Sequence, residues 1–261
     1  MIPSNTKDWN PETYARFRGL RLRPALDLLS QVGDLPDGPI VDLGCGAGAV
    51  GQALVGRYPT HKLLGVDNSP AMLRDAEETG LYAQLELADA SEWRPEEPPA
   101  LIFSNALLHW LPDHQRLFPK LAGYLGPGGV LAIQMPRQQM APSHALMRDI
   151  AQNIFPEVFD FSDWKPQVAQ PESYAKLLSV YGSLNLWETS YLQVLSSVEE
   201  GHPVRHFTQS TAMRPFASAL SRQDFRKFLN VYDAALSEAY PLADDGSVSF
   251  QFQRLFIVLS T

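Results

Sequence analysis

The sequence contains one cysteine in 261 residues, so it can form no disulfide within the chain and offers no pair of cysteines for a metal site. No apolar run reaches the roughly 18 consecutive residues that a membrane-spanning helix needs. The first residues, from Met1 to Tyr14, lack the apolar stretch of a secretory signal peptide. We therefore expect a cytoplasmic protein whose thiol stays reduced.

Basic residues are also scarce. Lysine and arginine together number 21 against 29 acidic residues, which gives a net charge of −8. Proteins that bind nucleic acid or anionic membranes through long-range attraction carry the opposite balance, so we expect neither partner. A small anionic ligand is still compatible, because a pocket can be locally basic. The sequence does not determine the oligomeric state.

Short apolar segments alternate with helix-compatible segments between residues 39 and 135. Strands that alternate with helices form parallel sheets, so we predict an α/β fold with a Rossmann-like sheet and helices on both faces. The predicted strands are Ile40–Leu43, Leu63–Val66, Ala83–Leu87, Leu101–Phe103 and Val130–Gln134. The predicted helices between them are Ala49–Tyr58, Pro70–Thr79 and Pro112–Leu125.

The rest of the chain is predicted to complete this core. Residues 1–38 form an N-terminal helical segment that contributes to the site. Residues 136–247 form a mainly helical region that covers the ligand-binding edge of the sheet and so meets the substrate. Residues 248–261 return to the sheet as a final strand. The further predicted elements are helices at Pro24–Val32, Ser143–Ile150 and Arg222–Ala239 and strands at Leu184–Val194 and Val248–Leu259.

A glycine-rich loop follows the first predicted strand, in the sequence Asp42-Leu43-Gly44-Cys45-Gly46-Ala47-Gly48. Its three glycines let a ligand lie against the main chain. Residues 46–51 also match Gly-x-Gly-x-x-Gly, the dinucleotide-binding pattern. That pattern leaves its strand directly, whereas here Asp42 and an additional Gly-Cys come first. A carboxylate beside the loop suits a ligand with an ammonium group better than one with a pyrophosphate.

Acidic residues close three consecutive predicted strands, namely Asp42, Asp67 and Asp89. The acid after the second strand can accept both hydroxyls of a ribose, a feature that several nucleotide-binding folds share. Three such acids in register with a glycine loop are a far more specific signal than any one of them. The combined pattern resembles the motifs of class I S-adenosylmethionine (SAM) methyltransferases.

Segments along nearly the whole chain are similar to the trans-aconitate 2-methyltransferase family. They are Asp8-Trp9-Asn10-Pro11-Glu12, Arg21-Leu22-Arg23-Pro24-Ala25, Trp110-Leu111-Pro112-Asp113-His114, Ala132-Ile133-Gln134-Met135-Pro136, Pro142-Ser143-His144, Thr211-Ala212-Met213-Arg214-Pro215, Tyr240-Pro241 and Phe252-Gln253-Arg254-Leu255-Phe256. The resemblance implies SAM-dependent O-methylation of a carboxylate on a small polycarboxylic acid such as trans-aconitate, with S-adenosylhomocysteine as the other product.

The resemblance also implies which residues hold SAM. It puts Asp67 at the ribose, Asp89 and Ala90 at the adenine, and Arg23 at the SAM carboxylate with Tyr14 packed beside it. The full implied set is Tyr14, Arg23, Asp42, Gly44, Cys45, Gly46, Asp67, Asn68, Met72, Asp89, Ala90, Asn105, Ala106 and Trp110.

The implied reaction needs no catalytic acid or base. A carboxylic acid with a pKa of about 4 is ionised at neutral pH and is already a nucleophile. The enzyme must instead orient a multiply charged anion, for which the planar guanidinium of arginine is well suited. The predicted substrate-binding residues are Trp9, His109, Gln134, His144, Arg214 and Arg254. No metal site is predicted, because the six histidines lack His-x-x-x-His spacing.

Three alternatives stay open. A nicotinamide-dependent oxidoreductase would use residues 46–51. A SAM-binding protein without transferase activity would have a blocked acceptor pocket. A methyltransferase for another small acid or a phenol would owe its specificity to positions that depart from the family, where Arg137 replaces an acid, His109 a glutamine and Ala212 a glycine. A nucleic-acid methyltransferase is disfavoured, since the chain has no basic stretch and no Asn/Asp-Pro-Pro-Tyr/Phe motif.

Overall fold

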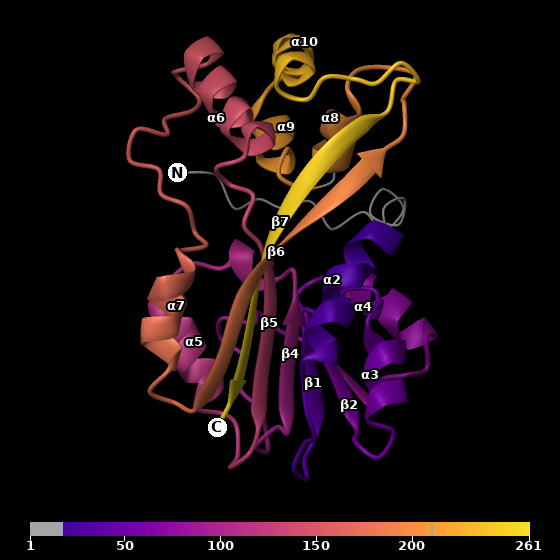
Figure 1. Cartoon of the computed structure of the whole chain (residues 1–261), viewed down its shortest axis with the longest axis vertical. Helices are drawn as coiled ribbons and strands as arrows, with labels where there is room; N and C mark the ends of the chain where they lie inside the picture. Colours follow the sequence, from indigo (N-terminus) through magenta and orange to yellow (C-terminus); the bar gives the residue numbers. More distant parts are fainter. Residues whose placement is uncertain (1–17, 210) are drawn as a thin grey trace. The chain divides into compact units, whose positions relative to one another are not determined.

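The computed structural model describes residues 18–209 and 211–261 and divides into two compact units (Figure 1). We call residues 18–136, 167–189 and 254–261 the sheet unit. Residues 137–166 and 190–253, without the undescribed residue 210, form the insert unit. In the described part of the chain, no helix combines the length and the apolar character needed to cross a bilayer.

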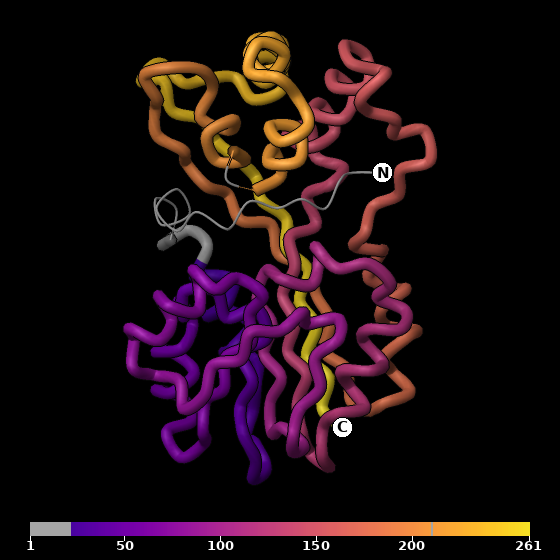
Figure 2. Tube along the Cα trace, turned by 180° about the vertical axis from the view of Figure 1, so that it is seen from behind, coloured from indigo at the N-terminus to yellow at the C-terminus, as the bar shows by residue number. Residues whose placement is uncertain are grey.

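The sheet has seven strands in the order β3-β2-β1-β4-β5-β7-β6. They are β1 (Ile40–Leu43), β2 (Leu63–Asp67), β3 (Gln84–Leu87), β4 (Leu101–Asn105), β5 (Val130–Pro136), β6 (Ser183–Leu195) and β7 (Val248–Ser260). Strands β1 to β5 are parallel, and β7 pairs antiparallel with β5. From behind, the yellow trace of β7 runs beside the magenta strands (Figure 2). The predicted Rossmann-like sheet is therefore confirmed.

Helices cover both faces of the sheet, as predicted (Figure 1). On one side lie α2 (Arg18–Ser30), α3 (Gly51–Arg57) and α4 (Pro70–Glu78), and on the other lie α5 (His114–Ala122) and α7 (Pro171–Leu178). Strand β3 at the edge of the sheet is largely exposed, whereas β1, β4 and β5 are buried along nearly their whole length. Burial on both faces explains why these strands read as continuous apolar runs.

The connection from β3 to β4 contains no helix, and all of its residues are described. Trp93 fills part of the space where a helix would pack. Its indole Nε1 donates to Glu86 at 3.1 Å, and its ring meets Tyr124 edge-on at 6.0 Å between centroids. Pro95, Pro98 and Pro99 explain the absence of a helix, because proline lacks the amide that a helix interior needs.

The insert unit contains α6 (Pro142–Ile154), α8 (Pro203–Gln209), α9 (Arg214–Ala219) and α10 (Arg222–Ala239). Its core is largely aromatic and includes Phe207, Phe216, Phe228, Tyr232 and Phe250. The start of α10 falls where the sequence predicted it, because Ser221 accepts a hydrogen bond from the amide of Asp224 as an N-cap.

Several elements differ from the sequence-based expectation. The segment 167–189 belongs to the sheet unit rather than to the covering region, because Tyr174 and Leu178 of α7 are buried in the core of the sheet unit. The helix expected at Pro112–Leu125 is shorter, at His114–Ala122, since Asp113 before it has a left-handed backbone with φ of 57°. Helices α7, α8 and α9 were not predicted.

Candidate functional site

Several predicted cofactor residues lie at or near the carboxyl edge of the parallel strands. Asp42 lies in β1, Asp67 ends β2 and Asn105 ends β4. Parallel pairing brings these strand ends to one edge, and Asn105 lies directly beside Gln134 of β5. In open α/β sheets, ligands bind outside this edge.

The glycines of the first loop serve two purposes. Gly44, Gly46 and Gly48 all have positive φ, at 81°, 54° and 75°, which favours glycine. A Cβ on Gly44 would lie 2.7 Å from the side chain of Leu107, so this glycine allows the loop to pack. A Cβ on Gly46 would have no atom within 4 Å, so the main chain there borders open space that a ligand can fill.

Asp67 connects the loops that follow β1 and β2. Its carboxylate accepts from the amide of Gly46 at 2.9 Å and from the amide of Ser69 at 2.9 Å. Ser69 is in turn the N-cap of α4 and accepts from the amide of Met72. Asp67 therefore ties the loops after β1 and β2 to each other at the carboxyl edge.

Asp42 is a buried carboxyl group beside this loop, with 2% of its surface exposed. Its Oδ2 accepts a hydrogen bond from the hydroxyl of Tyr82 at 2.8 Å. Burial raises the pKa of Asp42 to about 7, the Tyr82 hydrogen bond acts in the opposite direction, and the charge of Asp67 raises the pKa further. Asp42 can therefore change its charge near neutral pH.

Cys45 is buried in the same loop. Burial raises the pKa of its thiol, and the nearby charges of Asp42 and Asp67 raise the pKa further. We therefore predict that Cys45 reacts with iodoacetamide at pH 7.5 at least tenfold more slowly than free cysteine, because only the thiolate is nucleophilic. Mass spectrometry of the native protein measures the rate, and the denatured protein is the control. Modification as fast as in the denatured protein would contradict the buried, protonated thiol.

The residues after β3 and β4 are placed differently from one another. Asp89 is exposed two residues beyond β3, and its Oδ1 accepts from both the amide and the hydroxyl of Ser91 at 2.8 Å. Ala106 after β4 has φ of 56°, a conformation that a residue with a side chain rarely adopts. The amide of Ala106 donates to the carbonyl of Gln134 at 2.9 Å, which holds this turn against β5.

A group of buried polar side chains lies where β4 and β5 end and where the middle of β7 pairs with β5. Gln134 is 1% exposed and Arg254 is 4% exposed. Arg254 Nη1 donates to Gln134 Oε1 at 3.2 Å. Within the described residues, Gln134 Nε2 and Asn105 Oδ1 are buried without a hydrogen-bond partner. Because unmatched buried polar atoms cost free energy, these atoms indicate a polar ligand.

The contacts of the other predicted cofactor and substrate residues with ligands stay predictions. Trp9 and Tyr14 lie outside the described residues. Arg23 is exposed on α2 and pairs with Asp27 at 3.8 Å. His109 and Trp110 belong to the short helix η1 (Leu108–Trp110), with ring centroids 4.7 Å apart. Asn68 is exposed, whereas Met72 and Ala90 are buried.

His144 and Arg214 belong to the insert unit, and their predicted contact with substrate stays a prediction. His144 lies in α6, where its Nδ1 is 3.0 Å from the hydroxyl of Ser143. Burial, together with the charge of Arg148, lowers the pKa of His144 to about 4. The imidazole is therefore neutral at pH 7 and can donate one hydrogen bond. Arg214 begins α9.

The structure adds two residues that the sequence did not single out. Leu107 fills the space beside Gly44, and Tyr82 binds Asp42. Neither belongs to a recognisable motif. Among the described residues, no group of three or more His, Cys, Asp or Glu side chains is arranged to hold a metal ion.

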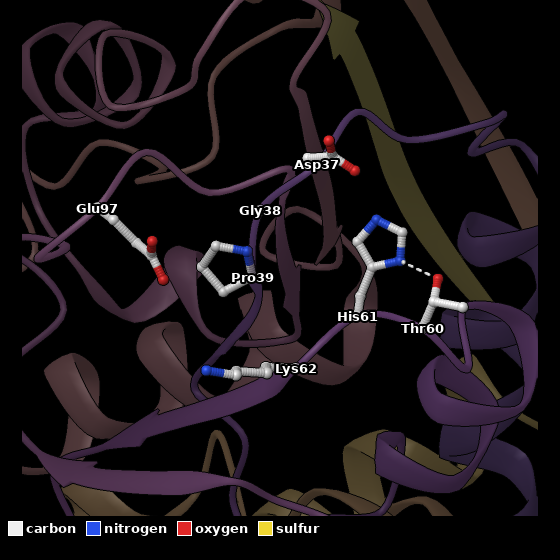
Figure 3. Close-up of a pocket in the computed structure, with 7 residues that line it drawn as sticks. All are labelled: Asp37, Gly38, Pro39, Thr60, His61, Lys62 and Glu97. Atoms are coloured by element: carbon white, nitrogen blue, oxygen red, sulfur yellow. Dashed lines mark hydrogen bonds between the residues drawn. The ribbon is translucent and has the colours of Figure 1, made fainter.

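Two shallow cavities lie elsewhere in the sheet unit. One, of about 270 Å³, is lined by residues that include Asp37, Thr60, His61, Lys62 and Glu97 (Figure 3). The other, of about 240 Å³, shares Pro39, Lys62 and Glu97 with it and is also lined by Trp93. Pro39 and Lys62 precede β1 and β2, so the first cavity is at the amino ends of these strands. The second extends from there along β1, β2 and β3, past Val41, Val66 and Glu86.

Comparisons with known proteins agree with this geometry. A family model described as a methyltransferase domain matches residues 40–129. A trans-aconitate 2-methyltransferase of Methylobacterium nodulans is 40% identical over 255 residues, which cover 96% of this chain and 97% of that protein. A trans-aconitate 2-methyltransferase of Klebsiella pneumoniae is 38% identical over 253 residues, with the same coverage of both chains.

Solved structures share the fold at low sequence identity. YcgJ from Bacillus subtilis has a TM-score of 0.57 and 13% identity, and the match covers 92% of this chain and 98% of YcgJ. Phosphoethanolamine N-methyltransferase 2 from Haemonchus contortus, in complex with phosphomonomethylethanolamine and S-adenosylhomocysteine, has a TM-score of 0.52 and 16% identity. That match covers 91% of this chain and 52% of the other.

Proposed function

Because the chain belongs to the family of SAM-dependent trans-aconitate 2-methyltransferases, we propose that it methylates a carboxylate oxygen of a small polycarboxylic acid such as trans-aconitate. The observation that carries the choice of acceptor is the buried pair Gln134 and Arg254 at the carboxyl edge of the sheet. A guanidinium and an amide donor together match a carboxylate, which accepts hydrogen bonds on both oxygens.

The residues at the carboxyl edge fit SAM. The open space at Gly46 accepts a ligand against the main chain, and the carboxylate of Asp67 at the end of β2 is the type of group that accepts ribose hydroxyls. Asp42 supplies negative charge for a ligand with an ammonium group. Asp89 Oδ2 and the amide of Ala90 are proposed to contact the adenine. When bound, SAM supplies an electrophilic methyl group on a positively charged sulfur.

The chain's own residues then have the task of positioning. An acceptor carboxylate is ionised at neutral pH, so no residue has to remove a proton from it. Arg254 and Gln134 hold the acceptor's carboxylates in a fixed orientation, and holding two reactants in line lowers the barrier by several kcal/mol. The buried surroundings of this pair strengthen its attraction for an anion, because they exclude water.

Of the alternative functions considered from the sequence, one is excluded and the others are decided by experiment. Family membership over nearly the whole chain removes the nicotinamide-dependent oxidoreductase, and the match of residues 46–51 to the dinucleotide pattern is incidental. A different small acid, a phenol or a binding role without turnover are outcomes of the test below.

The test is methyl transfer from labelled SAM to a panel of di- and tricarboxylic acids that includes trans-aconitate, with simple phenols as controls. Turnover of trans-aconitate is the expected result. Turnover only on another acid would make Arg137, His109 and Ala212 the first positions to revert. If the protein bound SAM but transferred methyl groups to none of these compounds, the proposed reaction would be wrong.

Replacing Asp67 by alanine should weaken SAM binding about tenfold. The change removes an acceptor for the ribose hydroxyls. It also removes the hydrogen bonds from the amides of Gly46 and Ser69, each of which contributes about 1 kcal/mol to the stability of these loops. Isothermal titration of SAM measures the effect. Asp75→Ala on α4 is the control, since Asp75 lies outside this arrangement, and equal affinities in the two variants would contradict the assignment.

A further inference from the structure

Tyr82 precedes β3, and its ring lies under the glycine loop and β2. Three glycines make room for it. A Cβ on Gly48 would lie 3.0 Å from Tyr82 Cε2, a Cβ on Gly51 would lie 3.0 Å from its hydroxyl, and a Cβ on Gly65 would lie 2.8 Å from its Cδ1. Real Cβ atoms essentially never come as close as at Gly65, where Leu85 would also be met at 2.6 Å, and the 3.0 Å distances at Gly48 and Gly51 are tighter than most Cβ contacts. Glycine at all three positions therefore accommodates the Tyr82 ring.

The hydroxyl of Tyr82 is hydrogen-bonded to Asp42. It donates to Asp42 Oδ2 at 2.8 Å inside the sheet unit, where the carboxyl group is shielded from water. Burial and the negative charge of Asp42 raise the pKa of Tyr82, so the phenol stays neutral and remains a donor at every pH at which the protein works. Tyr82 therefore offers the Asp42 carboxylate a permanent hydrogen bond.

The surroundings of Asp42 are otherwise unfavourable to charge. Among the described residues, the ionisable groups that act on it are Tyr82 from the turn before β3, Asp67 from the end of β2 and Cys45 from the glycine loop. Asp67 is an acid and repels a second negative charge. Cys45 is a protonated thiol at neutral pH. No cation of the described chain is among these groups, so Tyr82 carries the stabilisation of the ionised form.

We propose that Tyr82 is a positioning residue of the cofactor site, which keeps Asp42 ionised beside the glycine loop and so extends tight SAM binding to lower pH. The inference rests on the proposed function, because it takes SAM as the ligand of this loop. SAM carries an ammonium and a sulfonium group, and both favour an ionised Asp42 over a neutral one.

The direction of the pH effect follows from the charges. Affinity for SAM is highest when Asp42 is ionised and falls as the pH drops through the pKa of Asp42, which is about 7. The hydrogen bond from Tyr82 stabilises the ionised form and lowers this pKa. Loss of the hydroxyl therefore raises the pKa, and the decline in affinity begins at a higher pH.

The experiment is to titrate wild-type protein and Tyr82→Phe with SAM by calorimetry from pH 5.5 to pH 9. In the wild type, we expect the Kd to rise about tenfold or more between pH 9 and pH 5.5 as Asp42 becomes protonated. In Tyr82→Phe, we expect the midpoint to move up by about one pH unit, so that the Kd at pH 7 is about three- to tenfold weaker and converges with wild type near pH 9.

Tyr58→Phe is the matched control. Tyr58 is also buried, and its hydroxyl donates to the carbonyl of Gly33 at 2.7 Å, but it lies at the C-cap of α3 away from Asp42. This variant loses a comparable hydrogen bond and should keep the wild-type pH profile. A Tyr82→Phe curve parallel to wild type at every pH would overturn the proposal, since it would show a packing role alone.

A second variant covers the case in which Tyr82→Phe does not fold. Asp42→Asn removes the titrating group, and its SAM affinity should be weak and constant across the pH range. A wild-type midpoint that persists in Asp42→Asn would assign the pH dependence to another group and refute the inference. Failure of the wild type to bind SAM at any pH would instead refute the proposed function.

Discussion

Replacing Arg254 by alanine is expected to raise the KM for the acceptor acid about 10- to 100-fold while leaving the Kd for SAM within about twofold. A charge-assisted hydrogen bond to a buried carboxylate contributes about 1.5–3 kcal/mol, which corresponds to this range. Arg254 is 4% exposed and its guanidinium donates to Gln134, so the group is held in one orientation before the acceptor arrives. Steady-state kinetics on the acid identified by the panel measure the change.

Two further variants separate binding from folding. Arg254→Lys keeps the charge but loses the planar fork, so its KM should lie between those of wild type and alanine. Arg116→Ala removes an arginine whose side chain is 89% exposed on α5, and it should leave the KM unchanged. If Arg254→Ala lowered only kcat in proportion to the fraction of folded protein, Arg254 would be a structural residue and the acceptor assignment would be wrong.

The predicted positions of the cofactor residues follow from signals that are local in the sequence. The glycine loop and Asp42 are adjacent, and Asp67 follows directly on an apolar strand, so one strand prediction places each of them. Parallel strands then bring the strand ends together without further information. The strand β1 has the predicted bounds, and β2 and β5 extend one or two residues further into the site.

The periodicity of apolar residues could not predict the shortest helices. Helices α7, α8 and α9 have eight, seven and six residues, too few for an apolar face to repeat. Proline stands first in α7 and α8, a position that it favours, and this was the available signal. Burial of Tyr174 in the core decides that α7 belongs to the sheet unit.

Contacts between distant segments were also out of reach. Gln134 and Arg254 are 120 positions apart, and they meet because β7 pairs with β5 in a register that sets Arg254 opposite Pro136. Both residues were predicted from the sequence to bind substrate, but no pattern in the sequence predicted that they contact each other. Tyr82 is a stronger case, since its role depends on glycines in a loop, a helix and a strand, each of which has a local explanation of its own.

Replacing Asp42 by asparagine is expected to stabilise the protein at pH 8 and to weaken SAM binding by more than tenfold. The side chain keeps its shape and can still accept from Tyr82, but it loses a negative charge that is buried without a cationic partner among the described residues. An unfolded aspartate is ionised above a pKa of 3.8, whereas the folded Asp42 has a pKa of about 7. Folding therefore opposes ionisation between these values.

The sign of the stability change follows from this difference. Below pH 3.8 the carboxyl group is protonated in both states and costs nothing, and the cost grows as the pH rises until it is complete above about 7. Asp42→Asn should thus gain on the order of 2–4 kcal/mol at pH 8 and almost nothing at pH 4. Urea unfolding of both proteins at the two pH values measures it. If the variant is less stable than wild type at pH 8, other groups in the fold must compensate the charge of Asp42. The buried charge would then not lower the stability of the protein, and the interpretation that stability is given up for binding a cationic cofactor would be wrong.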